Sequence, residues 1–426
     1  MDGRAASQTM TDKIPFLLNA GLNLYVLSAI TGIQDKRFSH KQLIAWGPSA
    51  FRFDARHWVS NRYGRGYIYK LLTPIISVLL SPLIAIEKLI LGFSSQWSWS
   101  LPAYFYGRSL IKHSNIDVIY TTAGAWSALL AGLWLKKTTG LPWLVEIHDP
   151  MVIRSSCQDD GIIQPKNRDA RMRYWLEAQI CKYADLAWWF TDGALHYAKL
   201  RNPNLDRPNN AQSMMVIPGA NPPLVNQAKH VYSNSLNICH FGSLAEDRTL
   251  SQILDALPQL FQKYPEAKEL VYIHAYGSQL DSLSKTSIQK FNLEKNVCAH
   301  GRLEKDRKTG LSGREQIAIE MMKADVLVLL HGTTPWCAEY IPSKFYEYLW
   351  IPRPIWSLAY PNTQLNTLLE DRGAYISNST DPTSVQEKLE KIWIDWKGQK
   401  LVEPIFKPIS VENAVHQILT KAFGSP

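Results

Sequence analysis

The sequence predicts an α/β protein made of two Rossmann-like domains, each with a doubly wound parallel sheet, that face a cleft. Two observations carry this prediction. From about residue 110, short apolar runs alternate with longer helical patterns, and after the polar stretch Asn221–Asn234 the alternation starts again. Such alternation is typical of βαβ units. A chain of 426 residues, 46% of them hydrophobic, is long enough for two or three domains.

We place the first domain over residues 1–230, the second over 231–400, and a C-terminal helix over 401–426 that packs back toward the first domain. In the first domain the pattern predicts strands at Asp117–Thr122, Trp143–Ile147, Leu186–Phe190 and Met215–Ile217, with helices at Ser127–Lys137 and Asn167–Tyr183. In the second it predicts strands at Leu236–Phe241, Glu269–Tyr276, Val326–Leu330 and Pro354–Ser357, with helices at Leu250–Lys263, Ile317–Lys323 and Pro342–Trp350. Ligands of such sheets bind where the strands end.

The composition narrows the kinds of partner. A net charge of +9 favours an anionic partner. The sequence shows no motif for RNA or DNA, so we expect no nucleic acid and favour nucleotide-linked substrates or anionic lipid. The five cysteines are scattered without zinc spacing, which favours a reducing compartment and no bound metal. No cleavable signal is visible at the polar N-terminus, so we expect a cytoplasmic protein.

The segment Leu71–Phe93 is almost entirely apolar and has the length of a membrane span. Two prolines and the pair Glu87–Lys88 weaken that interpretation. Trp and Tyr residues beside Arg108 and Lys112 follow, a composition that suits the membrane–water interface. We therefore favour an interfacial helix or hairpin, and a membrane-facing segment over residues 71–108, ahead of a buried core helix or a true span.

The strongest chemical signal is the stretch Glu339–Trp350, EYIPSKFYEYLW. Pro342 suits the first turn of a helix, which would place Glu339 in the loop before it and Glu347 on its second turn. A helix N-terminus offers free backbone N–H groups to a diphosphate, and the carboxylates can accept hydrogen bonds from sugar or ribose hydroxyls. The alternative is a solvated amphipathic helix with a charged face.

This stretch resembles the glutamate–seven residues–glutamate motif of retaining GT-B glycosyltransferases, particularly family 4. The similarity includes the surrounding IPSK, YEYL and PRPIWSL residues. Weaker patterns of that family follow in order over residues 110–400, at HDP (148–150), VIPGAN (216–221) and CHFGS (239–243). The resemblance implies that a sugar moves from a nucleotide-diphosphate donor to an acceptor hydroxyl with retained configuration, and that neither a metal nor a bound cofactor is required.

The resemblance also implies site residues. Glu347 would bind the nucleotide ribose, while Glu339 would face the donor sugar or support the carboxylate that does. His148 matches a histidine that approaches the donor sugar. The phosphates would lie against the turn at Gly242 and Ser243 and against Arg248, Arg302, Pro342, Ser343 and Lys344. The family's usual arginine and lysine in the turn are replaced by Ser243 and a residue near Thr249, which leaves Arg248 as the cation of that loop.

A second departure from the family is at the N-terminus. Gly3 and Arg4 resemble the loop that contacts the donor phosphates and the acceptor, but the strand that usually precedes this loop has no counterpart in the sequence. We expect a saccharide or lipid-linked acceptor at the inner face of the membrane, in an assembly pathway for polysaccharide such as lipopolysaccharide or capsule. Two alternatives stay open: another GT-B enzyme such as a nucleotide-sugar epimerase or an inverting transferase, and a non-catalytic scaffold.

Overall fold

The structure is a computed structural model, and it describes residues 5–32, 34–64, 66–92, 96–153, 165, 167–225, 230–245, 247–277, 279–306 and 308–424. The chain divides into two compact units. The first contains the described residues up to Pro218 together with the C-terminal helix, and the second contains Gly219–Ser410. The divisions fall after residues 218 and 410, whereas the sequence placed them after 230 and 400. Each unit is described by itself.

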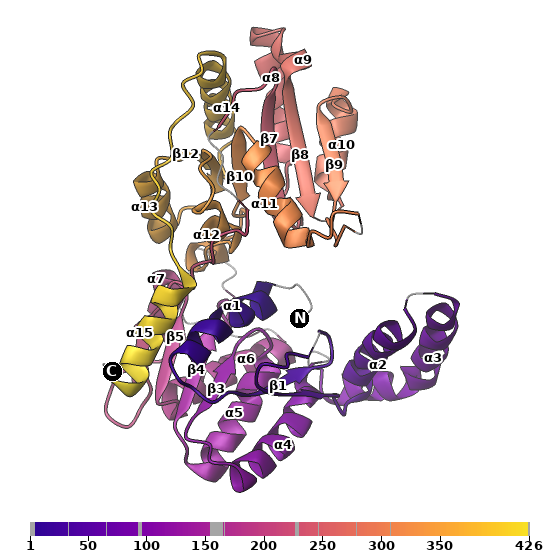
Figure 1. The fold of residues 1–426 in the computed structure, drawn as a ribbon, viewed down its shortest axis with the longest axis vertical. Coiled ribbons are helices and arrows are strands. Elements are labelled where there is room, and N and C mark those ends of the chain that lie inside the picture. The colour runs from indigo at the N-terminus through magenta and orange to yellow at the C-terminus, as the bar shows by residue number, and fades with distance from the viewer. Residues whose placement is uncertain are drawn as a thin grey trace. The chain divides into compact units, whose positions relative to one another are not determined.

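The first unit is built on a four-stranded sheet of parallel strands in chain order (Figure 1). The strands are β3 (Ile119–Thr122), β4 (Trp143–Ile147), β5 (Leu186–Trp189) and β6 (Gln212–Met215). The first three fall where the sequence predicts them, whereas β6 begins three residues before the predicted Met215–Ile217. Every residue of β4 and β5 is buried, as expected for parallel strands with both faces covered.

Helices cover both faces of this sheet. On one face, α5 (Trp126–Thr139) and α6 (Arg168–Tyr183) pack their leucines and isoleucines against alternate strand residues such as Val145 and Trp189. On the other face, Leu144 and Trp188 meet α15 (Val411–Phe423), which also packs on α1 (Ala5–Asn19). The side chain of Asn167 accepts a hydrogen bond from the Ala170 N–H and caps α6 at its predicted start.

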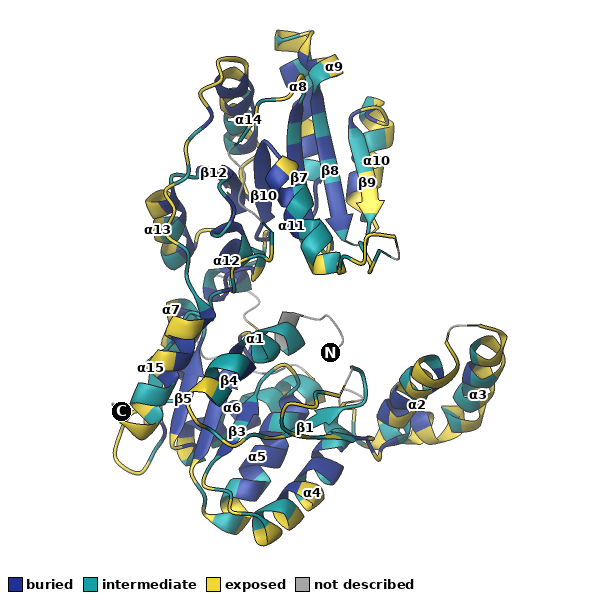
Figure 2. Ribbon diagram, in the orientation of Figure 1, coloured by how far each residue is buried: buried dark blue, intermediate teal, exposed yellow. Residues whose placement is uncertain are grey.

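Most of the remaining elements of the first unit precede β3 in the chain. A small parallel pair, β1 (Tyr25–Ala29) and β2 (Ser39–Leu43), leads into α2 (Pro48–Tyr63) and α3 (Tyr67–Ile90). The 3-10 turn η1 (Trp97–Trp99) and α4 (Ser100–His113) return the chain to the sheet, and α7 (Asp192–Arg201) follows β5. Only Thr73 and Ile84 of α3 are buried, so the structure contradicts a buried core helix at residues 71–93 (Figure 2).

The second unit contains a six-stranded parallel sheet in the order β12-β11-β10-β7-β8-β9. Its strands are β7 (Leu236–Gly242), β8 (Val271–Gly277), β9 (Val297–Gly301), β10 (Val326–Leu330), β11 (Ile355–Ala359) and β12 (Tyr375–Asn378). The chain moves outward from β7 in one direction and from β10 in the other. The sheet is therefore doubly wound, and its topological switch point lies between β7 and β10, where ligands of such sheets bind.

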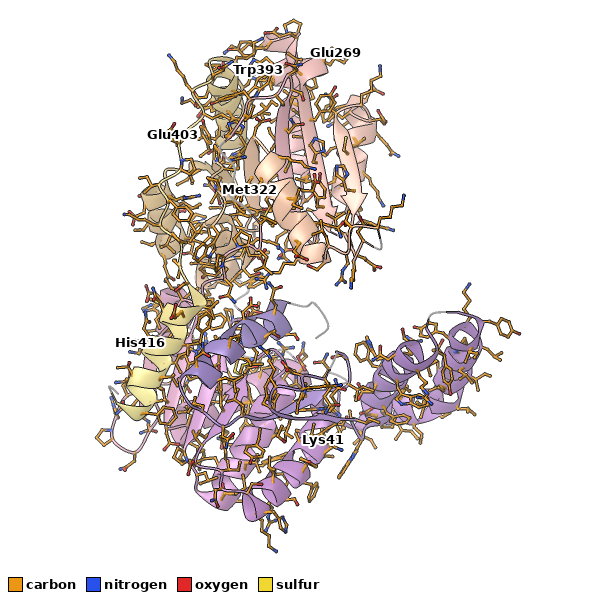
Figure 3. All side chains as sticks on the ribbon, in the orientation of Figure 1. Lys41, Glu269, Met322, Trp393, Glu403 and His416 are labelled. Carbon is orange, nitrogen blue, oxygen red and sulfur yellow. The ribbon has the colours of Figure 1, made fainter. Side chains whose placement is uncertain are left out.

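One face of this sheet forms the main core with α8 (Ser251–Lys263), α10 (Ser282–Phe291) and α14 (Pro382–Lys397). Trp393 of α14 is 1% exposed and packs against that face (Figure 3). The remaining helices are α9 (Ala267–Leu270), α11 (Gly313–Lys323), α12 (Lys344–Tyr348) and α13 (Thr363–Arg372), with the 3-10 turn η2 (Pro335–Glu339). The helix predicted at Pro342–Trp350 is thus shortened to the five residues of α12.

Candidate functional site

The turn after β7 is held in a tight conformation at the switch point. Gly242 has φ 157°, and a Cβ on Gly277, at the end of the neighbouring strand, would lie 2.2 Å from the Gly242 carbonyl oxygen. Ala245 and Arg248 exchange two backbone hydrogen bonds of 3.0 and 2.9 Å. These two hydrogen bonds hold the backbone from which the Arg248 side chain, the predicted cation, extends.

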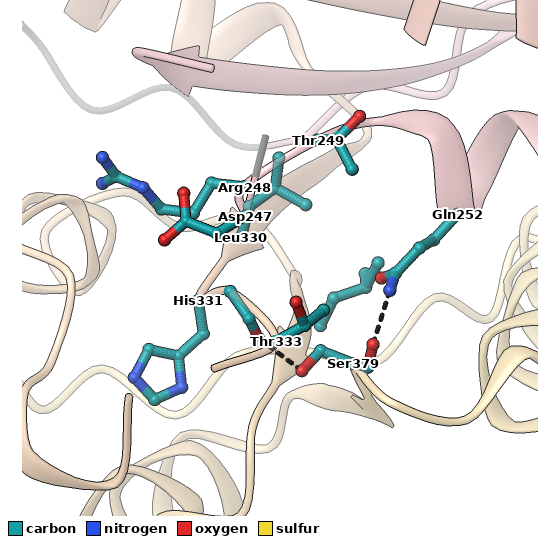
Figure 4. Close-up of a pocket in the computed structure, with 10 residues that line it drawn as sticks. Asp247, Arg248, Thr249, Gln252, Leu330, His331, Thr333 and Ser379 are labelled. Atoms are coloured by element: carbon teal, nitrogen blue, oxygen red, sulfur yellow. Dashed lines mark hydrogen bonds between the residues drawn. The ribbon is translucent and has the colours of Figure 1, made fainter. Parts of the chain in front are cut away.

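Arg248 lines a small open pocket at the ends of β7, β10, β11 and β12 (Figure 4). The Ser379 hydroxyl donates to the Gly332 carbonyl, and the Gln252 side chain donates to the Ser379 carbonyl. Gly332 has φ 113°, and a Cβ there would lie 2.9 Å from the Cys337 Sγ. Glycine at this position lets the loop after β10 approach the turn that carries Arg248.

Two buried histidines lie beside this cation. Burial lowers the pKa of His240, on β7, to about 4; the Val328 carbonyl opposes the change, and the charges of Arg248 and Lys344 add to it. Burial likewise lowers the pKa of His331 to about 4, with Arg248 again contributing. Both rings are therefore neutral at neutral pH. Lys344 lies near the same strand, because the Tyr348 hydroxyl of its helix α12 accepts a hydrogen bond from the Phe241 N–H of β7.

The short helix α12 carries the second predicted cluster. Lys344 Nζ lies 2.7 Å from Glu347 Oε2, and both side chains are partly exposed. The Tyr348 hydroxyl anchors the helix to the sheet, because it donates to the Val328 carbonyl and accepts from the Phe241 N–H. The helix is only one turn long, so Glu347 lies on its first turn and the predicted helix-dipole contribution at Pro342 is correspondingly small. Pro342 is buried and Ser343 is exposed before Lys344.

Glu339 ends η2 and is fully buried. The loop around it is held firmly: Asn362 Nδ2 donates to the carbonyls of Cys337 and Tyr340 at 3.1 Å, and the Trp336 and Tyr340 rings stack with centroids 4.4 Å apart. Of the two roles that the resemblance implies, burial fits support of a neighbouring group better than direct contact with a sugar.

The first unit contains a separate polar cluster around His148. His148 Nε2 donates to Glu146 Oε1 over 2.6 Å, and its ring stacks on Phe190 with centroids 4.7 Å apart. The Lys13 ammonium and the Tyr120 hydroxyl both donate to the other oxygen of Glu146. Burial alone would raise the pKa of Glu146, but Lys13 and His148 outweigh it and hold that pKa well below its ordinary value. Glu146 is therefore a carboxylate that orients the His148 ring.

The structure brings some of the predicted residues together and separates others. Gly242, Ser243, Arg248, Lys344 and Glu347 lie at the switch point of the second unit. Arg302 is exposed after β9, with β8 between its strand and β7, and no described contact joins it to the cluster. Gly3 and Arg4 lie outside the described residues. Among the residues that the structure describes, no group of three or more His, Cys, Asp or Glu is placed to hold a metal ion.

Sequence reasoning missed Lys13, Glu146, His240 and His331. Glu146 stands inside an otherwise apolar strand, WLVEI, and such an acid must find a partner when it is buried. That pattern was a usable signal for a buried polar site. Lys13, 133 residues away, gave no comparable signal.

Comparisons with solved structures identify the fold. OtsA superposes with a TM-score of 0.53 and 13% identity over 76% of this chain and 77% of its own. An alpha,alpha-trehalose-phosphate synthase (UDP-forming) from Burkholderia xenovorans, in complex with glucose-6-phosphate, has a TM-score of 0.50 with 11% identity over 77% of each chain. TarM also gives 0.50, with 11% identity over 78% of this chain.

This chain spans 56% of the length of TarM. Neither a protein-family model nor a curated protein sequence matches the chain. The two parallel sheets and these structural neighbours show that the protein has the GT-B glycosyltransferase fold, with two Rossmann-like domains.

Proposed function

We propose that the protein is a retaining glycosyltransferase that moves a sugar from a nucleotide-diphosphate donor to an acceptor hydroxyl. The observation that carries this proposal is the arrangement at the switch point of the second unit. There Arg248 extends from the turn after β7, Lys344 is on α12, which is hydrogen-bonded to β7 through Tyr348 and Phe241, and Glu347 is beside Lys344. Two cations and a partly exposed carboxylate are what a nucleotide diphosphate and its ribose require.

The proposed chemistry follows from the charge that develops. Glycosyl transfer passes through an oxocarbenium-like transition state, and negative charge grows on the departing diphosphate. Arg248 and Lys344 neutralise that charge, which is the main electrostatic demand of the reaction. In this scheme no metal and no further cofactor are needed. The departing phosphate takes the proton of the acceptor hydroxyl, and the sugar–phosphate bond breaks as the new glycosidic bond forms on the same face.

Glu347 would accept hydrogen bonds from the ribose hydroxyls once the donor displaces Lys344 from it. Glu339 would keep the loop after β10 in place. His148, oriented by Glu146, would approach the donor sugar, as the resemblance implies. Because Nε2 donates to Glu146, Nδ1 is the ring nitrogen that a sugar hydroxyl can contact.

For the acceptor we propose a saccharide or lipid-linked saccharide at the inner face of the membrane, and hence a cytoplasmic protein bound peripherally there. The support is the net charge of +9 and the apolar, aromatic segment 71–108. We further propose polysaccharide or glycolipid assembly as the pathway, and no nucleic acid partner.

The test is a binding screen with nucleotide sugars followed by one substitution. A ligand of the native state raises its apparent stability, so purified protein is screened by thermal shift against UDP-, GDP-, ADP- and dTDP-sugars. Glu347→Ala is then expected to weaken binding of the active donor by about 1–3 kcal/mol, the scale of hydrogen bonds to a charged group. Glu370→Ala, at an exposed position on α13, is the matched control and should bind as the parent protein does.

The outcomes separate the proposal from its alternatives. A donor that shifts the melting temperature and releases its nucleotide in the presence of an acceptor supports the transferase. A folded sample that no donor stabilises supports the non-catalytic scaffold. Equal affinity of the Glu347→Ala and Glu370→Ala variants would contradict the site assignment.

A further inference from the structure

The hairpin of α2 and α3 presents a continuous apolar face to solvent. Among the described residues, α3 is the one helix long and apolar enough to cross a membrane. Its most apolar stretch of 18 residues has a mean hydropathy of 1.8, yet only 11% of that stretch is buried in the protein. Its exposed apolar residues recur at spacings of three and four, namely Leu71, Ile75, Val78, Leu79, Leu83, Ile86 and Leu89, which are 50, 47, 70, 71, 50, 53 and 80% exposed. They therefore form one stripe along the helix.

The opposite side of α3 packs against the rest of the protein. Thr73 and Ile84 are buried on that side, and Ser77 Oγ accepts a hydrogen bond from Arg56 of α2. Near the end of α3, Glu87 accepts from the Ser49 N–H and hydroxyl at 2.8 and 2.5 Å and from the Trp97 indole at 3.1 Å. The hairpin is therefore a defined structure whose outer face is left uncovered.

The charges of the hairpin are segregated. Both acids of the hairpin are used internally: Asp54 accepts from the Ala45 N–H at 2.9 Å, and Glu87 is bound as described above. The cations are at the surface, with Arg56, Arg62, Lys70 and Lys88 all exposed. The exposed aromatic residues of the hairpin accompany them: Phe51, Phe53, Trp58, Tyr63 and Tyr67. A surface that is apolar, aromatic and positively charged is complementary to the interface of an anionic bilayer.

The geometry distinguishes binding in the interface from crossing. At 1.5 Å per residue, the 24 residues of α3 extend about 36 Å, enough for a bilayer core of about 30 Å. However, α2 runs antiparallel along α3, since Ser49 meets Glu87 and Arg56 meets Ser77. A transmembrane α3 would take Arg56 and the ionisable Asp54 into the hydrocarbon, which is strongly unfavourable.

We propose that the α2–α3 hairpin is a monotopic membrane anchor, which lies in the plane of an anionic bilayer with the exposed stripe of α3 among the acyl chains and its cations at the head groups. This inference deepens the proposed peripheral location but does not depend on catalysis. Lipid would then cover the apolar surface that the fold leaves exposed on the 24-residue helix α3.

The test is sedimentation of the full chain with detergent-free vesicles of phosphatidylcholine, with and without phosphatidylglycerol. We expect binding to the anionic vesicles that is reversible and weakens when sodium chloride is raised from about 0.1 to about 0.5 M. The variant Val78→Glu/Leu89→Glu should lose at least about tenfold in vesicle affinity, because two apolar side chains that would lie among the acyl chains are replaced by negatively charged ones. The control Leu224→Glu/Val231→Glu changes the same residue types at positions 86 and 81% exposed in the second unit, and should bind normally.

Three results would overturn the anchor. The first two are no binding of the parent protein to either kind of vesicle, and equal binding by the hairpin variant and its control. The third is a parent protein that is a dimer in sedimentation velocity and that becomes a monomer in the hairpin variant alone. The last would assign the stripe to contact between copies of the chain. Retention on vesicles at high salt that only detergent reverses would instead favour insertion across the bilayer. Nucleotide-sugar binding, measured on the same variants, is expected to be unchanged, so failure of the anchor is distinguishable from failure of the transferase proposal.

Discussion

Replacing Lys13 by methionine tests the buried charge cluster that orients His148. The Lys13 side chain is 1% exposed and that of Glu146 is 0% exposed, so removal of the ammonium leaves a buried carboxylate with only the His148 N–H and the Tyr120 hydroxyl as described partners. Removing one partner of a buried ion pair costs about 3–5 kcal/mol, because the remaining charge is uncompensated. We expect Lys13→Met to destabilise the first unit by this amount.

The matched control is Lys136→Met, which removes a cation from the same unit. Lys136 Nζ lies 2.8 Å from Asp185 Oδ2, but the two side chains are 19 and 47% exposed. Solvent-exposed ion pairs contribute about 0–1 kcal/mol, so this substitution should change stability little. The double variant Lys13→Met/Glu146→Gln removes both charges and should recover part of the loss, since burying two neutral groups avoids the lone carboxylate.

The assay is hydrogen–deuterium exchange read by mass spectrometry, because a chain of two compact units need not unfold in one step. Peptides that cover β4 report the first unit, and peptides that cover β10 serve as an internal reference in the second. We expect exchange of β4 to accelerate in Lys13→Met while β10 is unchanged. If Lys13→Met and Lys136→Met accelerate β4 equally, the buried pair does not have the energetic role assigned to it.

Two further predictions concern the second unit. The pKa of His240 and that of His331 are each about 4 in the folded protein, against 6.5 in the unfolded chain. Between these two values the rings take up protons when the protein unfolds, so the stability of the folded state falls as the pH drops from 6.5 toward 4. At about 1.36 kcal/mol per pH unit for each ring, the two rings together should lower the free energy of unfolding by about 4 kcal/mol at pH 5. A urea-unfolding midpoint of the second unit that does not change between pH 6.5 and pH 5 would contradict the burial of two neutral rings. Gly332→Ala should destabilise by about 1–3 kcal/mol through its φ of 113° and the close Cys337 Sγ. The control Gly310→Ala has φ 74° but nothing within 4 Å, and it should cost less in the same denaturation.

The strands were the most predictable part of the fold. Trp143–Ile147 and Val326–Leu330 were predicted with the bounds that the structure gives, because strands covered on both faces are uninterrupted apolar runs. The helix at 342–350 was predicted too long. Its aromatic residues Phe345, Tyr346 and Tyr348 are all buried, so the apolar pattern does not show where helical hydrogen bonding ends.

The candidate site was predictable in part, for a physical reason. Arg248, Lys344 and Glu347 follow strands in sequence, and the ends of parallel strands meet at one edge of a sheet, so local patterns place them together. Lys13 of α1 and Glu146 of β4 meet through a tertiary contact across 133 positions, which no local period encodes. The neutral state of His240 likewise depends on burial and on the nearby charges of Arg248 and Lys344, neither of which a sequence window contains.

The two polar clusters belong to different units, and this makes their roles separable. Lys13, Glu146 and His148 lie in the first unit, whereas Arg248, Lys344 and Glu347 lie in the second. If the second unit alone holds the nucleotide, a free nucleoside diphosphate should bind the Lys13→Met protein as tightly as the parent, while Glu347→Ala weakens it. Glycosyl transfer, in contrast, should fall in both variants, because the carboxylate that holds His148 loses its ammonium partner in Lys13→Met and donor binding is weakened in Glu347→Ala. A Lys13→Met protein that binds the free diphosphate weakly, with β10 still protected from exchange, would show that nucleotide recognition is shared between the units.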